Sequence, residues 1–100
     1  MQKRRYQFSA SVWVYPGVAA WHFLSVPKKE SAGIKQAFHE KKRGWGSLPV
    51  AVTIGKTTWN TSIFPDTKSG TYLLPLKAAV RKREHIFAKE ELRVSLKIEA

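Results

Sequence analysis

Residues 57–82 read T-T-W-N-T-S-I-F-P-D-T-K-S-G-T-Y-L-L-P-L-K-A-A-V-R-K, and the predicted fold is organised around this stretch. Apolar or large side chains alternate with polar ones from Trp59 to Ile63, which is the period-2 pattern of a half-buried strand. Pro65-Asp66 and Ser69-Gly70 predict a loop. The chain resumes an extended run at Tyr72–Leu74, so we expect a strand, a loop and a second strand.

A short basic helix is predicted to follow. Pro75 lacks a backbone donor and has a fixed φ, which suits the start of a helix. Leu76, Ala79 and Val80 would then share one helix face, while Lys77 and Arg81 would lie one turn apart on another. Two cations near a helix N-terminus favour an anion. This pair is the clearest candidate for a functional site in the sequence.

Towards the N-terminus, alternation from Tyr6 to Val14 predicts a strand with one buried face. Pro and Gly in 15–17 have the residue order of a type II turn, and residues 21–26 predict a second strand. A helix should open at Pro27 and lay an apolar stripe, which includes Ile34 and Phe38, on the sheet. Lys41, Lys42 and Arg43 would crowd its C-terminus, and Gly44 would stop it.

After a glycine-flanked loop that carries Trp45, alternation predicts a strand over 50–54 and another over 92–98. Gly55-Lys56 is a two-residue hairpin loop with the type II′ preference for Gly first. Together these elements predict a mainly β fold: a small closed or partly open β-barrel of about six strands with two short capping helices. The expected core residues are Phe8, Val12, Phe23, Val52, Ile54, Leu92, Val94 and Leu96.

One hundred residues indicate one domain, which we expect at 6–100 after a basic arm at 1–5. The chain has no cysteine, which excludes disulfides, thiolate metal sites and cysteine nucleophiles. No apolar run approaches the ~20 residues of a membrane span, and no signal-peptide core follows the N-terminus. We therefore expect a cytoplasmic monomer that does not bind a membrane.

The motifs of common enzymes are absent from the sequence. The three histidines, His22, His39 and His85, have no paired metal-ligand spacing, so no metal or cofactor is expected. Asp66 is the only aspartate, which rules out paired-aspartate chemistry. No nucleophile elbow or P-loop occurs, and the S-x-x-K match at 25–28 lacks its companion motifs. We expect a protein without catalytic activity.

The first functional hypothesis is a binding module for an anionic or aromatic ligand or for a protein partner. Its pocket would be lined by Trp21, Trp59 and Tyr72, and Lys77 and Arg81 would supply positive charge. The tryptophans could instead pack in the core. Asp66 is expected to position Arg81, and a salt bridge between Asp66 and Arg81 that leaves no room for a ligand is the competing interpretation.

The second hypothesis is a nucleic-acid-binding barrel, because 18 Lys and Arg against 7 Asp and Glu give a net charge of +11. Such an excess favours polyanionic partners. The candidate contacts form three basic clusters: Lys3, Arg4 and Arg5; Lys41, Lys42 and Arg43; and Lys82 and Arg83.

A set of motifs spans the chain: Tyr15-Pro16-Gly17, Trp21-His22-Phe23, Pro27, Gly44-Trp45-Gly46-Ser47, the Gly55 hairpin, Trp59 through Asp66, Gly70 through Lys77, and Val80-Arg81-Lys82. Together these motifs resemble the domain of unknown function DUF1905 over nearly the whole chain after Arg5. The resemblance implies a bacterial or archaeal barrel of the double-split type, with no assigned activity. The last third is also similar to AbrB and MazE transcription-factor barrels, although 89–91 replaces their Gly-Asp turn.

Overall fold

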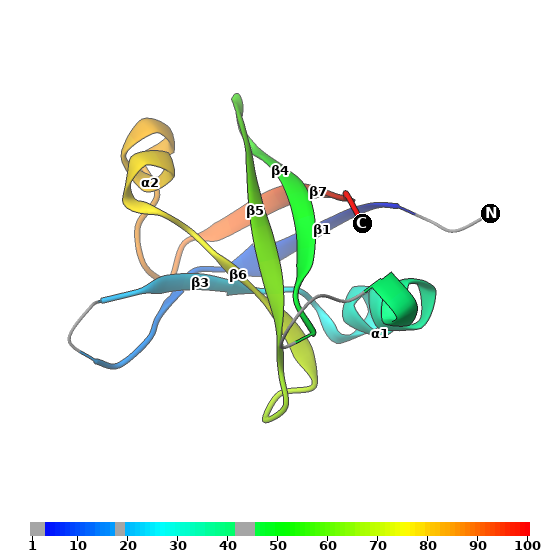
Figure 1. Ribbon diagram of the computed structural model, residues 1–100. Helices are drawn as coiled ribbons and strands as arrows, with labels where there is room; N and C mark the ends of the chain where they lie inside the picture. Colours follow the sequence, from blue (N-terminus) through cyan, green and yellow to red (C-terminus); the bar gives the residue numbers. More distant parts are fainter. Residues whose placement is uncertain (1–3, 18–19, 42–45) are drawn as a thin grey trace.

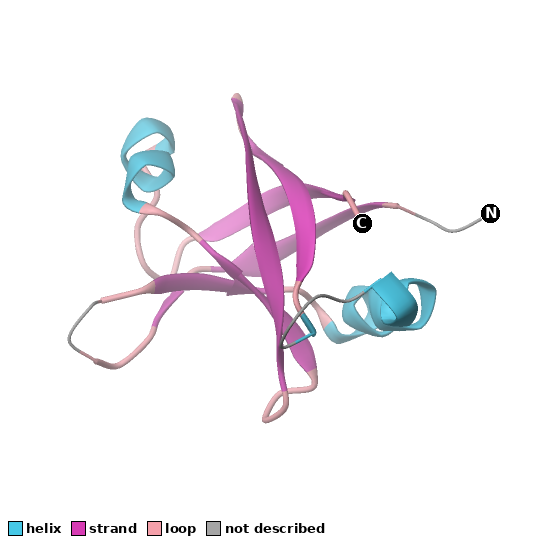
Figure 2. Ribbon diagram, in the orientation of Figure 1, coloured by secondary structure: helices cyan, strands magenta, loops and turns pink. Residues whose placement is uncertain are grey.

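A computed structural model describes residues 4–17, 20–41 and 46–100, and in it strands dominate over helices (Figures 1 and 2). The mainly β prediction is confirmed. The helices are α1 (Lys28–Phe38), the 3-10 helix η1 (His39–Lys41) and α2 (Ala78–Glu84). The strands are β1 (Arg5–Ser11), β2 (Trp13–Val14), β3 (His22–Ser25), β4 (Leu48–Ile54), β5 (Thr57–Asp66), β6 (Thr71–Pro75) and β7 (Glu91–Ile98).

The strands form one antiparallel sheet in the order β1-β7-β4-β5-β6-β3-β2, which curls into a half-barrel. The described residues thus contain seven strands where about six were expected. The extra strand arises because the predicted strand from Tyr6 to Val14 breaks at Val12. The Val12 N–H donates to the Glu90 carbonyl at 2.9 Å, and its carbonyl accepts the Lys89 N–H at 2.7 Å. Beyond this point the chain leaves β7 and pairs with β3 instead.

The core lies inside the curl and matches most of the expected residues. Phe8, Val12, Val52, Ile54, Val94 and Leu96 are all buried. Phe23 and Leu92 were expected in the core and are only half-buried. Phe23 packs on the other face of β3, where its ring centroid lies 5.1 Å from that of Trp13. Leu92 lies near the start of β7 and packs against the edge of the core.

The two predicted turns of the first half have different outcomes. Gly55 adopts a φ of 60° in the two-residue hairpin that joins β4 and β5, as the type II′ prediction requires. Gly17 does not adopt the positive φ that a type II turn needs at its third residue. The chain instead reverses over a longer loop, which is closed where the Tyr15 N–H donates to the Trp21 carbonyl at 2.7 Å.

Helix α1 begins after Pro27 as predicted, and Ile34 and Phe38 are buried beneath it. It ends at Phe38 and continues as η1 to Lys41, earlier than the expected stop at Gly44. Lys42, Arg43, Gly44 and Trp45 lie outside the described residues, so the predicted basic helix end and aromatic loop are not tested.

The second helix begins three residues later than predicted. Pro75 is the last residue of β6, and α2 starts at Ala78 with Lys77 before it. Pro75 is tolerated in the strand because it pairs with Phe23 at a position where its nitrogen points away from β3. The next residue, Leu76, continues the ladder by donating to the His22 carbonyl at 2.9 Å. The helix start is therefore set by the end of this ladder.

A carboxylate on α2 attaches the helix to the β4–β5 hairpin. Glu84 accepts the Thr57 hydroxyl at 2.6 Å and the Lys56 N–H at 3.3 Å. A Cβ on Gly55 would collide with this carboxylate, so glycine serves both the turn and the contact. These hydrogen bonds join the β4–β5 hairpin to α2.

Candidate functional site

The candidate site lies where β5 and β6 separate. Strand β6 pairs with only the last three residues of β5, Phe64–Asp66, while β4 pairs with 57–63 on the other side. Beyond Leu73 the two strands diverge, and β6 runs towards α2 (Figure 1). A pocket of about 270 Å³ occupies this divergence.

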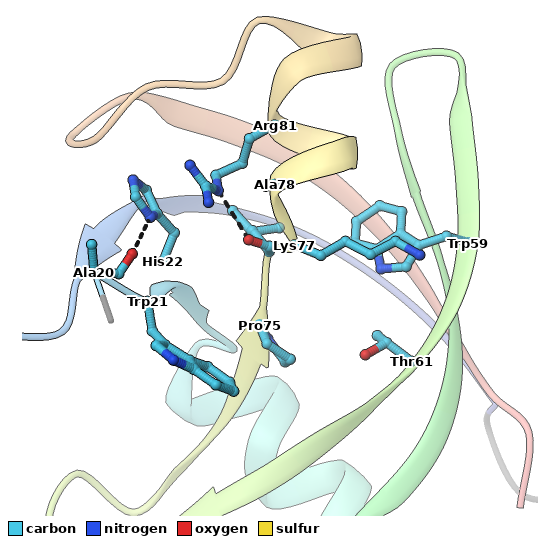
Figure 3. Close-up of a pocket in the computed structure, with 10 residues that line it drawn as sticks. Ala20, Trp21, His22, Trp59, Thr61, Pro75, Lys77, Ala78 and Arg81 are labelled. Carbon is cyan, nitrogen blue, oxygen red and sulfur yellow. Dashed lines mark hydrogen bonds between the residues drawn. The ribbon is translucent and has the colours of Figure 1, made fainter. Parts of the chain in front are cut away.

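Two tryptophans line the pocket from different elements (Figure 3). Trp59 comes from β5 and is 8% exposed, whereas Trp21 precedes β3 and is 56% exposed. The Trp21 ring stacks on Phe23, with centroids 6.0 Å apart and planes inclined by 24°. One face of Trp21 is thereby supported, so the indole can offer its other face to a planar ligand.

Two cations lie at the start of α2. Lys77 is exposed at the position before the helix, and its side chain extends in the direction of Trp59 (Figure 3). Arg81 is half-buried, and its Nε donates to the Leu76 carbonyl at 3.1 Å. The rest of the guanidinium points towards the His22 ring (Figure 3). Because one N–H of Arg81 is bound to the backbone, its guanidinium is oriented before any ligand arrives.

Two further polar side chains of this pocket were missed by the sequence analysis. His22 is the first residue of β3, and its Nδ1 lies 2.9 Å from the Ala20 carbonyl. Thr61 lies two positions after Trp59 on β5, so it is on the same face of the strand and lines the same pocket. The period-2 pattern from Trp59 to Ile63 could have predicted that Thr61 shares a strand face with Trp59. No described residue that lines the pocket is acidic, so the arrangement favours an anion.

Asp66 does not contact Arg81, and the predicted salt bridge between them is wrong. Asp66 lies at the β5–β6 turn, where it accepts the Ser69 hydroxyl at 2.7 Å. This hydrogen bond is the main reason that the pKa of Asp66 is lowered. Strand β6 separates the two residues, and its four residue steps span about 13 Å. Among the described residues, only His39 and Glu40 come within ion-pair distance.

Tyr72 is also outside the pocket. It is 4% exposed, and with Asp66 it lines a different cavity beneath α1. Its backbone N–H donates to the buried Ser31 hydroxyl at 3.0 Å. The alternation of β6 explains this placement, because Tyr72 and Pro75 are three positions apart in the strand and point to opposite faces, and Pro75 is the one that lines the pocket. The structure therefore gathers four of the six predicted residues: Trp21, Trp59, Lys77 and Arg81.

The burial of Tyr72 leads to a prediction about alkaline stability. Burial raises the pKa of Tyr72, so the unfolded chain ionises this residue at a lower pH than the folded one. The stabilising effect of the neutral phenol should therefore be complete below pH 10 and be lost as pH rises through the folded pKa. Thermal melts from pH 8 to 11 should show a smaller alkaline loss for Tyr72→Phe than for the wild type. Equal losses would contradict the prediction.

The basic-cluster residues that the structure describes are spread over different elements. Arg4 donates from Nη1 to the Ala100 carbonyl at 2.7 Å, and its guanidinium carbon lies 5.6 Å from the Phe38 ring centroid. Arg5 is the first residue of β1. Lys82 and Arg83 are exposed on α2, at the opposite end of the molecule from α1 and η1 (Figure 2). Lys3, Lys42 and Arg43 lie outside the described residues.

Fold and site together define a small, mainly β protein with a cationic, aromatic pocket where its sheet divides. The family model of the domain of unknown function DUF1905 matches residues 8–96, and the chain belongs to that family. No curated protein matched the sequence. No helix in the described ranges is long and apolar enough to cross a membrane. Nor do the described residues bring three His, Asp or Glu side chains together as a metal site would require.

Proposed function

We propose that this protein is a non-enzymatic binding module whose pocket between β5, β3 and α2 takes a small ligand with a planar ring and an anionic group. The observation that carries the proposal is the joint lining of one pocket by Trp21, Trp59, Lys77 and Arg81. Binding pockets generally combine apolar walls with a few directed polar groups. The indoles would hold the ring, and the two cations would hold a carboxylate or phosphate.

The orientation of Arg81 supports this proposal. Fixing a long side chain on binding costs roughly 0.5–1.5 kcal/mol, and the bond from Nε to the Leu76 carbonyl meets part of that cost in advance. A guanidinium can also bind a carboxylate or phosphate through two parallel hydrogen bonds. Lysine at this position would retain the charge but would lack the planar guanidinium that makes the two parallel hydrogen bonds.

A ligand screen by thermal shift tests the proposal. Anionic metabolites with and without a planar ring would be added to the wild type, Arg81→Ala, Arg81→Lys and Lys77→Ala. At 100 times its Kd a ligand stabilises by about 2.7 kcal/mol, which is a readily measured shift. We expect planar anions to stabilise the wild type, Arg81→Ala to abolish the shift, and Arg81→Lys not to restore it.

Arg83→Ala is the matched control, because Arg83 is exposed on the same helix and lines none of the described hollows around α2. It removes the same charge and should keep the full ligand shift. The comparison uses the shift on adding ligand, since Arg81→Ala also removes the bond to Leu76 and changes the starting melting temperature. A set of ligands with no difference between wild type and Arg81→Ala would refute the pocket.

We also propose that the protein acts in the cytoplasm, which its lack of cysteine favours. We propose in addition that it is a monomer. The alternative proposal is a nucleic-acid-binding barrel that contacts phosphates of DNA or RNA through the three basic clusters. Of their described residues, Arg5 begins β1, whereas Lys82 and Arg83 lie on α2. If this alternative holds, DNA or RNA should bind at low salt and binding should weaken steeply as salt rises. Absence of binding to both at 50 mM salt would exclude it.

A further inference from the structure

Three exposed aromatic side chains lie along one line of hollows on the surface. Tyr15 and Trp21 are each 56% exposed and Phe87 is 70% exposed, which is unusual for large aromatic residues in a small domain. Each lines a hollow that adjoins or forms the central pocket. Exposed aromatic residues that cluster beside cavities commonly mark a binding surface.

Neighbouring hollows share lining residues and therefore adjoin one another on the surface. A hollow of about 790 Å³ between Tyr15 and Leu73 shares Trp21 with the central pocket. On the other side, a hollow of about 390 Å³ that contains Phe87 shares His22 and Arg81 with the same pocket. A single track thus runs from Tyr15, across Trp21 and Arg81, to Phe87.

The Trp21 ring and the turn that carries Phe87 are held by neighbouring groups. Phe23 lies between Trp21 and Trp13, and the Trp13 Nε1 donates to the Ser25 hydroxyl at 3.0 Å. At the far end, the Phe87 N–H donates to the Glu90 carboxylate at 3.1 Å, which fixes the turn that carries Phe87. Rigid aromatic groups bind at a low cost in conformational entropy.

The charge along the track is positive. Lys68 lies in the first hollow, Lys77 and Arg81 in the second, and Lys82 in the third, with Arg81 shared between the last two. Asp66 is the one carboxylate that lines these hollows within the described chain, and it is bonded to Ser69. The surface therefore alternates platforms for planar rings with sites for anions.

We infer that this track binds a short single-stranded segment of RNA or DNA. A nucleic acid strand is a polymer that alternates planar bases with anionic phosphates, and proteins bind it by stacking bases on aromatic residues along a basic groove. Duplexes keep their bases stacked on one another and so cannot use the platforms. The inference rests on the proposed function, because the central pocket would hold one nucleotide of the strand.

Fluorescence anisotropy with labelled U10 and dT10 tests the inference, beside a ten-base-pair duplex as a comparison. The variants Tyr15→Ala and Phe87→Ala remove aromatic groups outside the central pocket. Since loss of one stacking residue costs about 1–3 kcal/mol, each should weaken single-strand binding roughly 5- to 160-fold. Phe64→Ala is the control, because Phe64 is 42% exposed but lines none of the three hollows. It should leave the affinity unchanged.

Stronger binding of U10 than of dT10, or the reverse, would show which nucleic acid is preferred, and both outcomes support the inference. Equal binding of duplex and single strand, or equal loss in Phe64→Ala and Phe87→Ala, would overturn it. If planar anions bind in an Arg81-dependent way but no oligonucleotide does, the inference fails and the proposed function stands. Absence of both kinds of binding overturns both.

Discussion

Replacement of Leu96 by Ala is expected to lower the free energy of unfolding by about 2–4 kcal/mol. Leu96 is fully buried on β7 and lies directly opposite Val52 of β4. Truncation of a buried leucine removes its transfer free energy and leaves a cavity that close-packed neighbours fill only in part. Small domains have a net stability of about 5–15 kcal/mol, so this loss is a large share of the total.

Urea denaturation of the wild type and Leu96→Ala measures the effect. Arg93→Ala is the matched control on the same strand, because Arg93 is exposed and should change stability by less than about 0.5 kcal/mol. Val52→Ala should cost about 1–3 kcal/mol, and the double variant should deviate from additivity because the two residues share a register position. Near-zero effects at Leu96 and Val52 would show that the buried faces were assigned wrongly.

The second large effect is expected at Ser31, which joins α1 to the sheet. Its side chain is 2% exposed, donates to the Val26 carbonyl at 2.9 Å and accepts the Tyr72 N–H at 3.0 Å. Ser31→Ala would leave the Tyr72 donor without this partner in a buried place, and an unsatisfied buried group costs about 1–3 kcal/mol. We expect a loss of stability of that size.

Hydrogen exchange distinguishes this mechanism from a general loss of packing. In Ser31→Ala the Tyr72 amide should exchange faster than amides at the centre of β4, such as that of Val52. Ser9→Ala is the control, since Ser9 is an exposed serine on β1 and its replacement should alter neither stability nor exchange. An unchanged melting temperature and unchanged exchange at Tyr72 would rule out the bridging role.

The pocket depends on the same interactions that set the position of α2. Glu84 attaches the end of the helix to the β4–β5 hairpin, and the ladder with β3 fixes its beginning through Leu76. Trp59 is carried by β5 and Arg81 by α2, and these contacts hold the two elements next to each other. A site built on fixed elements can present its polar groups without reorganisation, which favours binding.

Several features of this protein could be predicted from local sequence patterns. Alternation between positions 50 and 54 identified the buried faces of Val52 and Ile54, because side chains of a strand point to opposite faces in turn. Gly55 marked the hairpin, since a positive φ is inexpensive only for glycine. These signals depend on a residue and its near neighbours, and the unfolded chain already contains them.

Other features were decided only when distant segments met. Asp66 and Arg81 are fifteen positions apart and carry opposite charges, yet β6 lies between them, so the predicted pair cannot form. Tyr72 was expected in the pocket wall and is buried in the core, whereas Phe23 was expected in the core and packs against Trp13 and Trp21. A one-residue change in register moves a side chain to the other face of a sheet. Register, and the point at which β5 leaves β6, depend on the packing of the whole sheet, so the pocket exists only in the tertiary structure.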